Sequence, residues 1–293
     1  MSKSAVKIIA ITMGDPKGIG PEVIIKSLQR KDIAQLGNFI LIGDKKLLKH
    51  TKASVIDIAY KTSGEGSLRF LEKGVELIKG GVVDAIVTAP LSKEAVSHYK
   101  KDFRGHTEYL AESFNVTNFD MMFVSPQVRL SLVTRHVAIK DVPKMITKAN
   151  VYSCIELMHK TLKKQFGIIN PRIAVLGLNP HAGEGGLLGD EELKHIMPAI
   201  QFARKNRIKV EGPYPADTFF SHHKAFDGVI AMYHDQGLTS IKGMYFKDLV
   251  NFTAGLPFVR TSPVHGTAFD IAGQDKADPS SMIAAIKLAF KLA

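Results

Sequence analysis

The amino-acid sequence predicts an α/β protein. Segments typical of strands and of helices alternate along most of the chain. The strand segments are short apolar runs bounded by glycine, proline or polar residues, as in parallel sheets that are buried on both faces. Dense polar clusters follow these runs, and ligands of α/β proteins bind beyond the carboxyl ends of strands.

The first hundred residues show this alternation in its simplest form. Residues 6–12 form an apolar strand, and a helix follows at 20–30, since Pro21 suits a first helical turn. Further strands are expected at 38–44 and 83–90. Between them, residues 67–81 form a helix that stops at two glycines. Its apolar residues recur at helical spacing: Leu68, Leu71, Val75 and Ile78.

From about residue 100 the pattern changes. Residues 121–134 read as two strands joined around Ser125-Pro126-Gln127, which predicts an antiparallel pair. The C-terminal helix, 279–293, has Ser280 or Ser281 as its expected N-cap. The change of pattern and the chain length favour two domains. The other expected elements are helices at 107–114, 141–149, 150–167 and 190–206 and strands at 172–180 and 228–237.

Composition excludes several classes of protein. The chain has 293 residues, 45% hydrophobic and 23% charged, which are ordinary values for a globular protein. Its apolar runs fall short of the roughly 18 to 20 residues that span a bilayer. The short apolar run at the start ends in Gly-Asp-Pro and reads as a strand instead of a signal peptide. A lone cysteine, Cys154, excludes an internal disulfide and a cysteine-based zinc site. We therefore expect a cytoplasmic protein.

The net charge of +11 raises the question of a nucleic-acid partner. However, the basic residues are scattered, and no sustained basic arm with interleaved aromatics occurs. This distribution favours solvated faces and attraction for an anionic substrate over nucleic acid or a membrane.

Three histidines lie where apolar strand segments end: His136, His181 and His234. Three neutral imidazoles would suit zinc or another divalent metal, with positions left open for substrate oxygens. Because they lie 45 and 53 residues apart, no local ligand motif exists. On spacing alone, ordinary polar residues at strand ends explain them better than a metal site does. Six further histidines read as surface residues: His50, His98, His159, His195, His222 and His223.

The glycine-rich segments match neither the GxGxxG fingerprint nor a P-loop. The helix that opens at residues 18–22 either offers backbone N–H groups to an anion or simply forms a tight turn. Cationic and polar donors of the kind that bind phosphate are also present, although each alone reads as a surface residue. They are His106, Thr107, Lys242, Asn251 and Arg260.

Taken together, six segments resemble the 4-hydroxythreonine-4-phosphate dehydrogenase family of vitamin B6 biosynthesis, with its erythronate and threonate 4-phosphate dehydrogenase relatives. They occur in family order: TMGDPKGIGPE, GHTE, LNPHAGEGGLLGDEE, GPYPADT, AMYHDQGL and LPFVRTSPVHGTAFDIAG. The last is also similar to the cofactor loop of isopropylmalate and isocitrate dehydrogenases. The resemblance implies a two-domain isopropylmalate dehydrogenase-like fold, not a Rossmann fold. We place one domain at 1–100 plus 258–293, with the cofactor loop, and the other at 101–257, with metal ligands and dimer contacts.

The resemblance also implies a homodimer that shares its active site at the subunit interface. Its divalent metal (zinc, magnesium or cobalt) would bind His136, His181 and His234, two from one subunit and one from the other. Lys242 and Asp235 are candidates for the general base by position. The substrate would contact His106, Thr107, Lys242, Asn251 and Arg260. The cofactor, NAD or NADP, would lie along His265, Gly266, Thr267, Ala268 and Asp270.

The implied reaction is NAD(P)-dependent oxidation of 4-phosphooxy-L-threonine, followed by metal-assisted decarboxylation to 3-amino-2-oxopropyl phosphate. D-Erythronate or D-threonate 4-phosphate is an alternative substrate. A metal-dependent acyltransferase or hydrolase on a related fold and a basic, non-enzymatic binding protein are further alternatives. Two departures from the family pattern stand out: the chain is short between its second strand and residue 66, and Arg135 replaces a common threonine.

Overall fold

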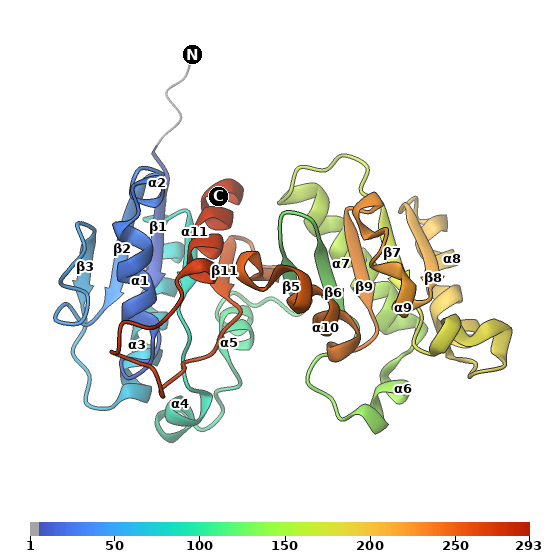
Figure 1. The fold of residues 1–293 in the computed structure, drawn as a ribbon, viewed down its shortest axis with the longest axis horizontal. Coiled ribbons are helices and arrows are strands. Elements are labelled where there is room, and N and C mark those ends of the chain that lie inside the picture. The colour runs from blue at the N-terminus through green and yellow to red at the C-terminus, as the bar shows by residue number, and fades with distance from the viewer. Residues whose placement is uncertain (1–5) are drawn as a thin grey trace, which may run out of the picture. The chain divides into compact units, whose positions relative to one another are not determined.

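The computed structural model describes residues 6–293 and divides into two compact units (Figure 1). Unit 1 contains residues 6–117 and 247–293, and unit 2 contains residues 118–246. The expected boundaries were residues 100 and 257, so the structure assigns about seventeen more residues to unit 1 at the first boundary and about eleven more at the second. No helix within residues 6–293 is long and apolar enough to cross a membrane.

The sheet of unit 1 runs in the order β3-β2-β1-β4-β11-β10. Its strands pair in parallel except for β10, which runs antiparallel to β11. Three consecutive residues of β1, Ile9, Ala10 and Ile11, are fully buried, so both faces of the sheet are covered. The strands are β1 (Ile8–Thr12), β2 (Asn38–Gly43), β3 (Ser54–Asp57), β4 (Ala85–Thr88), β10 (Val250–Ala254) and β11 (Val259–Pro263).

The helices of unit 1 pack on this sheet from two parts of the chain. Helix α3 packs on β1, β2 and β4, whereas α11 packs on β4, β10 and β11. The expectation that Ser280 or Ser281 caps α11 is wrong: Pro279 is the N-cap, and the Ser281 hydroxyl donates to the Leu249 carbonyl. The helices are α1 (Gly20–Gln29), α2 (Lys31–Ala34), α3 (Ser63–Lys79), α4 (Lys93–Tyr99), α5 (His106–Ser113) and α11 (Ser280–Leu292).

Helix α5 belongs to unit 1 because its apolar face joins the core there. Leu110 of α5 is fully buried and lies in one cluster with Leu68 and Leu71 of α3. Burying three leucine side chains stabilises the fold by several kcal/mol, at about 1.5 to 3 kcal/mol for each. The polar first turn of α5, which carries a predicted site segment, is thereby fixed to the unit 1 sheet.

The sheet of unit 2 runs in the order β5-β6-β9-β7-β8. Strands β5 and β6 pair antiparallel around residues 125–127, which confirms the expected hairpin, and the other pairs are parallel. The strands are β5 (Asp120–Val124), β6 (Arg129–Leu132), β7 (Ile173–Leu176), β8 (Val210–Tyr214) and β9 (Gly228–Ala231).

Two helices of unit 2 differ from the sequence expectation. The strand expected over 228–237 ends at Ala231, and helix α10 (His234–Tyr245) begins three residues later. The helix expected over 190–206 consists of a π-helical turn (Glu192–Ile196) and α8 (Met197–Lys205), since Pro198 lacks the N–H that a regular turn needs. The remaining helices are α6 (Val142–Met145), α7 (Lys148–Lys164) and α9 (Ala216–Phe219).

One of the six histidines expected at the surface is buried. His223 is only 4% exposed. Its Nδ1 lies 2.5 Å from the Phe220 carbonyl oxygen, and its Nε2 lies 3.0 Å from the Tyr245 hydroxyl. Both ring nitrogens are therefore engaged within unit 2, which makes His223 a structural residue.

Candidate active site

The strand order of unit 2 brings two of the three predicted histidines together. Strands β6 and β9 are parallel neighbours, and His136 and His234 follow their carboxyl ends. The Thr134 N–H and hydroxyl both donate to the Met232 carbonyl, at 3.0 and 2.8 Å, which joins the two strand ends. The imidazole rings of His136 and His234 consequently lie 5.6 Å apart between their centroids.

His234 is the first residue of α10, and its neighbours fix its ring. Its Nδ1 lies 2.6 Å from Oδ1 of Asp235, so Nδ1–H donates to the carboxylate and Nε2 keeps its lone pair for a ligand. Gln236 accepts from the Met232 N–H at 2.7 Å and donates to the Gly177 carbonyl at 2.6 Å. This side chain ties the start of α10 to the end of β7, the strand that precedes His181.

His181 lies in a turn with an uncommon backbone. The φ angle is positive at six successive residues, His181 (52°) through Gly186 (101°). Such left-handed conformations cost free energy in residues other than glycine and persist only where surrounding contacts hold them. Here the buried Glu192 carboxylate accepts from the Leu178 and Asn179 N–H groups at 2.7 and 2.8 Å. Glu192 thus holds the segment that leads into His181, which is exposed.

The chemistry of these side chains fits a divalent transition metal, because imidazole nitrogen is a preferred ligand of zinc and related ions. The pair His136 and His234 supplies two such donors on adjacent strand ends. Across residues 6–293, however, no three His, Cys, Asp or Glu side chains come close enough to hold a metal ion within one chain. His181 therefore does not join the pair in the single chain.

Arg260 is the most unusual side chain of unit 1. It lies on β11 and is 2% exposed. Its Nε and Nη2 donate to the Thr88 hydroxyl at 3.1 and 2.6 Å, and its Nη1 donates to the Thr253 hydroxyl at 3.0 Å. Burial lowers the pKa of Arg260 to about 10, with an opposing effect from the Glu108 carboxylate. Three of its five N–H donors are used, so two remain for an anionic ligand.

His106 lies near this guanidinium at the start of α5. Burial, together with the positive charges of Arg260 and Lys93, holds the pKa of His106 well below its usual range, so the imidazole is neutral. The N-cap residue, Gly105, provides no side chain to the first N–H groups of α5. A helix start without a capping side chain attracts an anion. Thr107 is buried beside it.

Asn251 and Lys242 complete the predicted substrate residues, and they lie in different units. Asn251 is on β10, beside the strand that carries Arg260, and its Oδ1 is buried without a hydrogen-bond partner in the described chain. A buried unpaired acceptor requires an explanation, and a bound ligand supplies one. Lys242 lies half-buried in the last turns of α10 in unit 2.

The predicted cofactor residues lie between β11 and α11. His265 has a pKa lowered by burial, and its Nε2 is buried without a partner in the part of the chain that the structure describes. Its Nδ1 lies 3.0 Å from the Gly266 carbonyl. The Thr267 carbonyl accepts from the Ile19 N–H at 2.9 Å, and Ala268 has a φ of 42°. Asp270 is exposed, so its carboxylate is accessible to a ligand that arrives from solvent.

The contacts of residues 17–19 favour the tight turn, one of the two interpretations of the helix start at 18–22. The N–H groups of Lys17 and Gly18 bond to Asp15, and that of Ile19 bonds to Thr267. The N–H groups of residues 17–19 are therefore used by a tight turn against the cofactor segment.

Sequence reasoning missed several residues of the unit 1 site. Thr88 and Thr253 hold Arg260, and Lys93 adds positive charge near His106. Asp15 is fully buried, and its Oδ2 has no partner within residues 6–293. Of these residues, only Asp15 lies in one of the six family segments, TMGDPKGIGPE. Thr88, Thr253 and Lys93 reach the site only through the order of the strands and helices, which local sequence does not show.

A comparison with known protein families decides the family. The model of the family described as "Pyridoxal phosphate biosynthetic protein PdxA" matches residues 10–289. The chain belongs to the PdxA family. A "4-hydroxythreonine-4-phosphate dehydrogenase" of Sulfurihydrogenibium sp. (strain YO3AOP1) is 38% identical over 315 residues, covering 97% of this chain and 98% of the relative. A "Putative D-threonate 4-phosphate dehydrogenase" of Oceanobacillus iheyensis is 43% identical over 325 residues and 98% of each chain.

Solved structures of PdxA relatives confirm the predicted fold. The 4-hydroxythreonine-4-phosphate dehydrogenase of Klebsiella pneumoniae has a TM-score of 0.88 at 36% identity, covering 97% of this chain and 98% of its own. A β-decarboxylating dehydrogenase of Thermococcus kodakarensis shares the fold at a TM-score of 0.54 and 14% identity. The two-domain isopropylmalate dehydrogenase-like class is therefore confirmed. Membership of a dehydrogenase family disfavours the acyltransferase, hydrolase and non-enzymatic alternatives.

Proposed function

We propose that this PdxA protein is a metal-dependent NAD(P)-linked dehydrogenase that oxidises 4-phosphooxy-L-threonine and decarboxylates the product, in pyridoxal phosphate biosynthesis. The observation that carries the proposal is the buried Arg260, whose hydrogen bonds in the described chain go to threonine hydroxyls and leave two donors unused. A phosphate group matches such a site, because it neutralises the buried charge and accepts both donors.

The phosphate is assigned to the residues around Arg260. Asn251 contributes the N–H donors of its amide, because its Oδ1, which is buried and unpaired in the described chain, is an acceptor and needs a donor from the ligand. His106 is neutral and so can donate one hydrogen bond and accept another, and Thr107 adds a hydroxyl from the same helix start. Lys93 adds positive charge near His106, and Lys242 of unit 2 remains a predicted substrate residue. Binding at this remote group orients the carbon that is oxidised.

The metal is assigned to His136, His181 and His234. One chain brings His136 and His234 together, so we propose that His181 of the partner subunit completes the site in a homodimer. The Asp235 carboxylate orients His234 through Nδ1. That contact makes Asp235 a positioning residue and leaves Lys242 as the candidate general base. A bound divalent cation (zinc, magnesium or cobalt) supplies Lewis acidity at the substrate oxygens.

The cofactor is assigned to the segment from His265 to Asp270. The buried Nε2 of His265 would offer a ring nitrogen to the dinucleotide, and the exposed Asp270 carboxylate would accept from a ribose hydroxyl. A carboxylate there would repel a 2′-phosphate, which favours NAD over NADP. When bound, the nicotinamide would supply the hydride acceptor for the oxidation, and a base, for which Lys242 is the candidate, would take the hydroxyl proton. Carbon dioxide then leaves the resulting β-keto acid to give 3-amino-2-oxopropyl phosphate.

A second candidate is the dehydrogenation of D-threonate or D-erythronate 4-phosphate. It is supported by the name of the relative from Oceanobacillus iheyensis, which is 43% identical to this chain. Both candidates use the same phosphate, metal and cofactor groups. They differ in whether the substrate carries an amino or a hydroxyl group next to the carboxylate.

A substrate comparison tests the proposal and separates the two candidates. Purified protein is assayed with each of the three phosphorylated acids and with NAD or NADP, and reduced nicotinamide is followed by absorbance with and without a chelator. We expect chelator-sensitive turnover with highest kcat/KM for 4-phosphooxy-L-threonine. Highest kcat/KM for a hydroxy acid supports the second candidate. Folded protein that reduces no cofactor with any of these acids would contradict both.

A further inference from the structure

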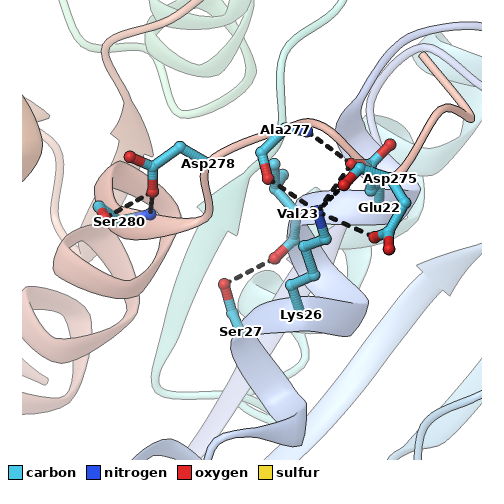
Figure 2. A network of polar contacts seen from close by, with 8 residues as sticks. All are labelled: Glu22, Val23, Lys26, Ser27, Asp275, Ala277, Asp278 and Ser280. Carbon is cyan, nitrogen blue, oxygen red and sulfur yellow. Dashed lines mark hydrogen bonds and ion pairs between the residues drawn. The ribbon is translucent and has the colours of Figure 1, made fainter. Parts of the chain in front are cut away.

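Residues 275–277, which follow the cofactor segment, are fastened to helix α1 by an ion-pair network (Figure 2). Lys26 Nζ donates to the backbone carbonyls of Asp275 and Ala277 at 2.8 and 3.0 Å, and it lies 2.9 Å from Oδ1 of Asp275. Glu22, one helical turn earlier, accepts from the Ala277 N–H at 2.7 Å and pairs with Lys26 at 3.0 Å. Two side chains of α1 therefore satisfy three backbone groups of the segment.

The pair differs from an ordinary surface ion pair. The side chains of Glu22 and Lys26 are only 12% and 25% exposed. Oε2 of Glu22 is buried without a partner in the described chain, so Lys26 supplies most of the compensation for that carboxylate. Hydrogen bonding to Asp275 is the main cause that raises the pKa of Lys26, which keeps the ammonium charged. Charge-assisted bonds to backbone carbonyls and an amide hold main chain directly, whereas an exposed pair holds only side chains.

The same helix holds the other end of the segment. The Ile19 N–H, just before α1, donates to the Thr267 carbonyl at 2.9 Å. A Cβ added to Gly18 would come within 2.9 Å of that carbonyl oxygen, so the two backbones are in close contact. Residues 268–274 thus form a short span, with one end attached at Ile19, just before α1, and the other attached to the first two turns of α1. Within it, Ala268 and Gly273 have positive φ angles of 42° and 74°.

We propose that Glu22 and Lys26 are positioning residues for the dinucleotide cofactor: by clamping residues 275–277 to α1 they hold 268–274 in the conformation that receives NAD or NADP. This inference rests on the proposed function, which assigns the cofactor to residues 265–270 and so to the first part of that span. The physical basis is preorganisation, because a segment already held in its binding conformation loses less conformational entropy when the ligand binds.

Single variants of the clamp test the inference. Lys26→Met removes the ammonium and keeps the aliphatic stem, Glu22→Gln keeps the shape, and Asp275→Asn changes one exposed contact. The matched control is Lys73→Met on α3, which breaks an ordinary helix-surface pair with Glu76 at 2.6 Å. Each is measured by hydrogen exchange of residues 268–277 without cofactor, by NADH and NADPH binding through nucleotide fluorescence, and by KM for the phosphorylated substrate.

We expect Lys26→Met to speed hydrogen exchange in residues 268–277 and to leave the substrate KM unchanged. Nucleotide binding should weaken about tenfold, which corresponds to the loss of one charge-assisted hydrogen bond. Asp275→Asn, which leaves the backbone contacts in place, should weaken binding by about twofold to threefold. Lys73→Met should match wild type. If wild type binds nucleotide and Lys26→Met and Glu22→Gln bind it equally well, the clamp assignment alone is overturned. If wild type binds neither nucleotide, the proposed function itself is refuted. That outcome is distinct from failure of the clamp, because it is seen in wild type and does not depend on the variants.

Discussion

Replacement of Arg260 by methionine should separate folding from substrate binding. The pKa of Arg260 falls from its ordinary 12.5 to about 10 because burial disfavours the charged form. A pKa difference of this size corresponds to a free energy of about 3 kcal/mol. At any pH below the pKa of the folded state, the buried charge lowers the free energy of unfolding by that amount. Arg260→Met removes this cost. It loses the bonds to Thr88 and Thr253, about 1 kcal/mol each, and leaves some unfilled volume.

The sum predicts that Arg260→Met folds with a free energy of unfolding within about 2 kcal/mol of wild type at pH 7. Substrate binding responds differently, because the phosphate loses its charge-assisted donors. KM should rise by about 100-fold. Inorganic phosphate at about 100 times its Kd should stabilise wild type by about 2.7 kcal/mol and should not stabilise the variant. Urea unfolding with and without phosphate, together with steady-state kinetics, measures both effects.

Arg129→Met is the matched control. Arg129 is a half-buried arginine of unit 2 whose pKa is also lowered by burial, and its guanidinium lies over the Phe166 ring. Its replacement should leave KM and the phosphate effect unchanged. An unchanged KM in Arg260→Met would remove Arg260 from the phosphate site. A loss of more than about 4 kcal/mol of stability would show that the guanidinium is a structural requirement and would refute the energetic reasoning.

Two further predictions concern unit 2. His181→Ala should lose bound metal and turnover yet keep its circular dichroism spectrum, since the side chain is exposed; full metal occupancy in this variant would contradict the three-histidine site. Burial raises the pKa of Asp120 to about 6, above its ordinary value of 3.8. The unfolded state then loses its proton first, so the free energy of unfolding should fall by about 3 kcal/mol as pH rises from about 4 to about 6. Asp120→Asn should flatten that part of the pH profile in urea unfolding, and coinciding profiles would disprove the assignment.

Much of the fold follows from local sequence patterns. The apolar runs at β1, β2, β4 and β7 are buried strands, because a strand covered on both faces needs apolar residues at every position. The antiparallel turn at 125–127 was also predictable. Local patterns failed where tertiary contacts decide the conformation. The segment after Ala231 reads as continuous strand, yet Gln236 satisfies the Met232 N–H and a helix begins at His234.

The candidate site shows the same division. Donor types and their places after strands could be read from the chain, and six family segments identified the family. Spacing along the chain did not reveal which donors meet, because His136 and His234 become neighbours only through the parallel pairing of β6 and β9. Thr88, Thr253 and Lys93 were missed for the same reason, since each reaches the site from a different element.

By itself the sequence determined the α/β class, the family and the kinds of side chain available for phosphate, metal and cofactor. Only the tertiary structure decided the environment of each group. It buried Arg260 against threonine hydroxyls, kept His106 neutral, held His181 in a left-handed turn and clamped residues 275–277 to α1. The physical reason is that charge state and backbone conformation depend on desolvation and on partners distant in the chain, which local patterns do not encode.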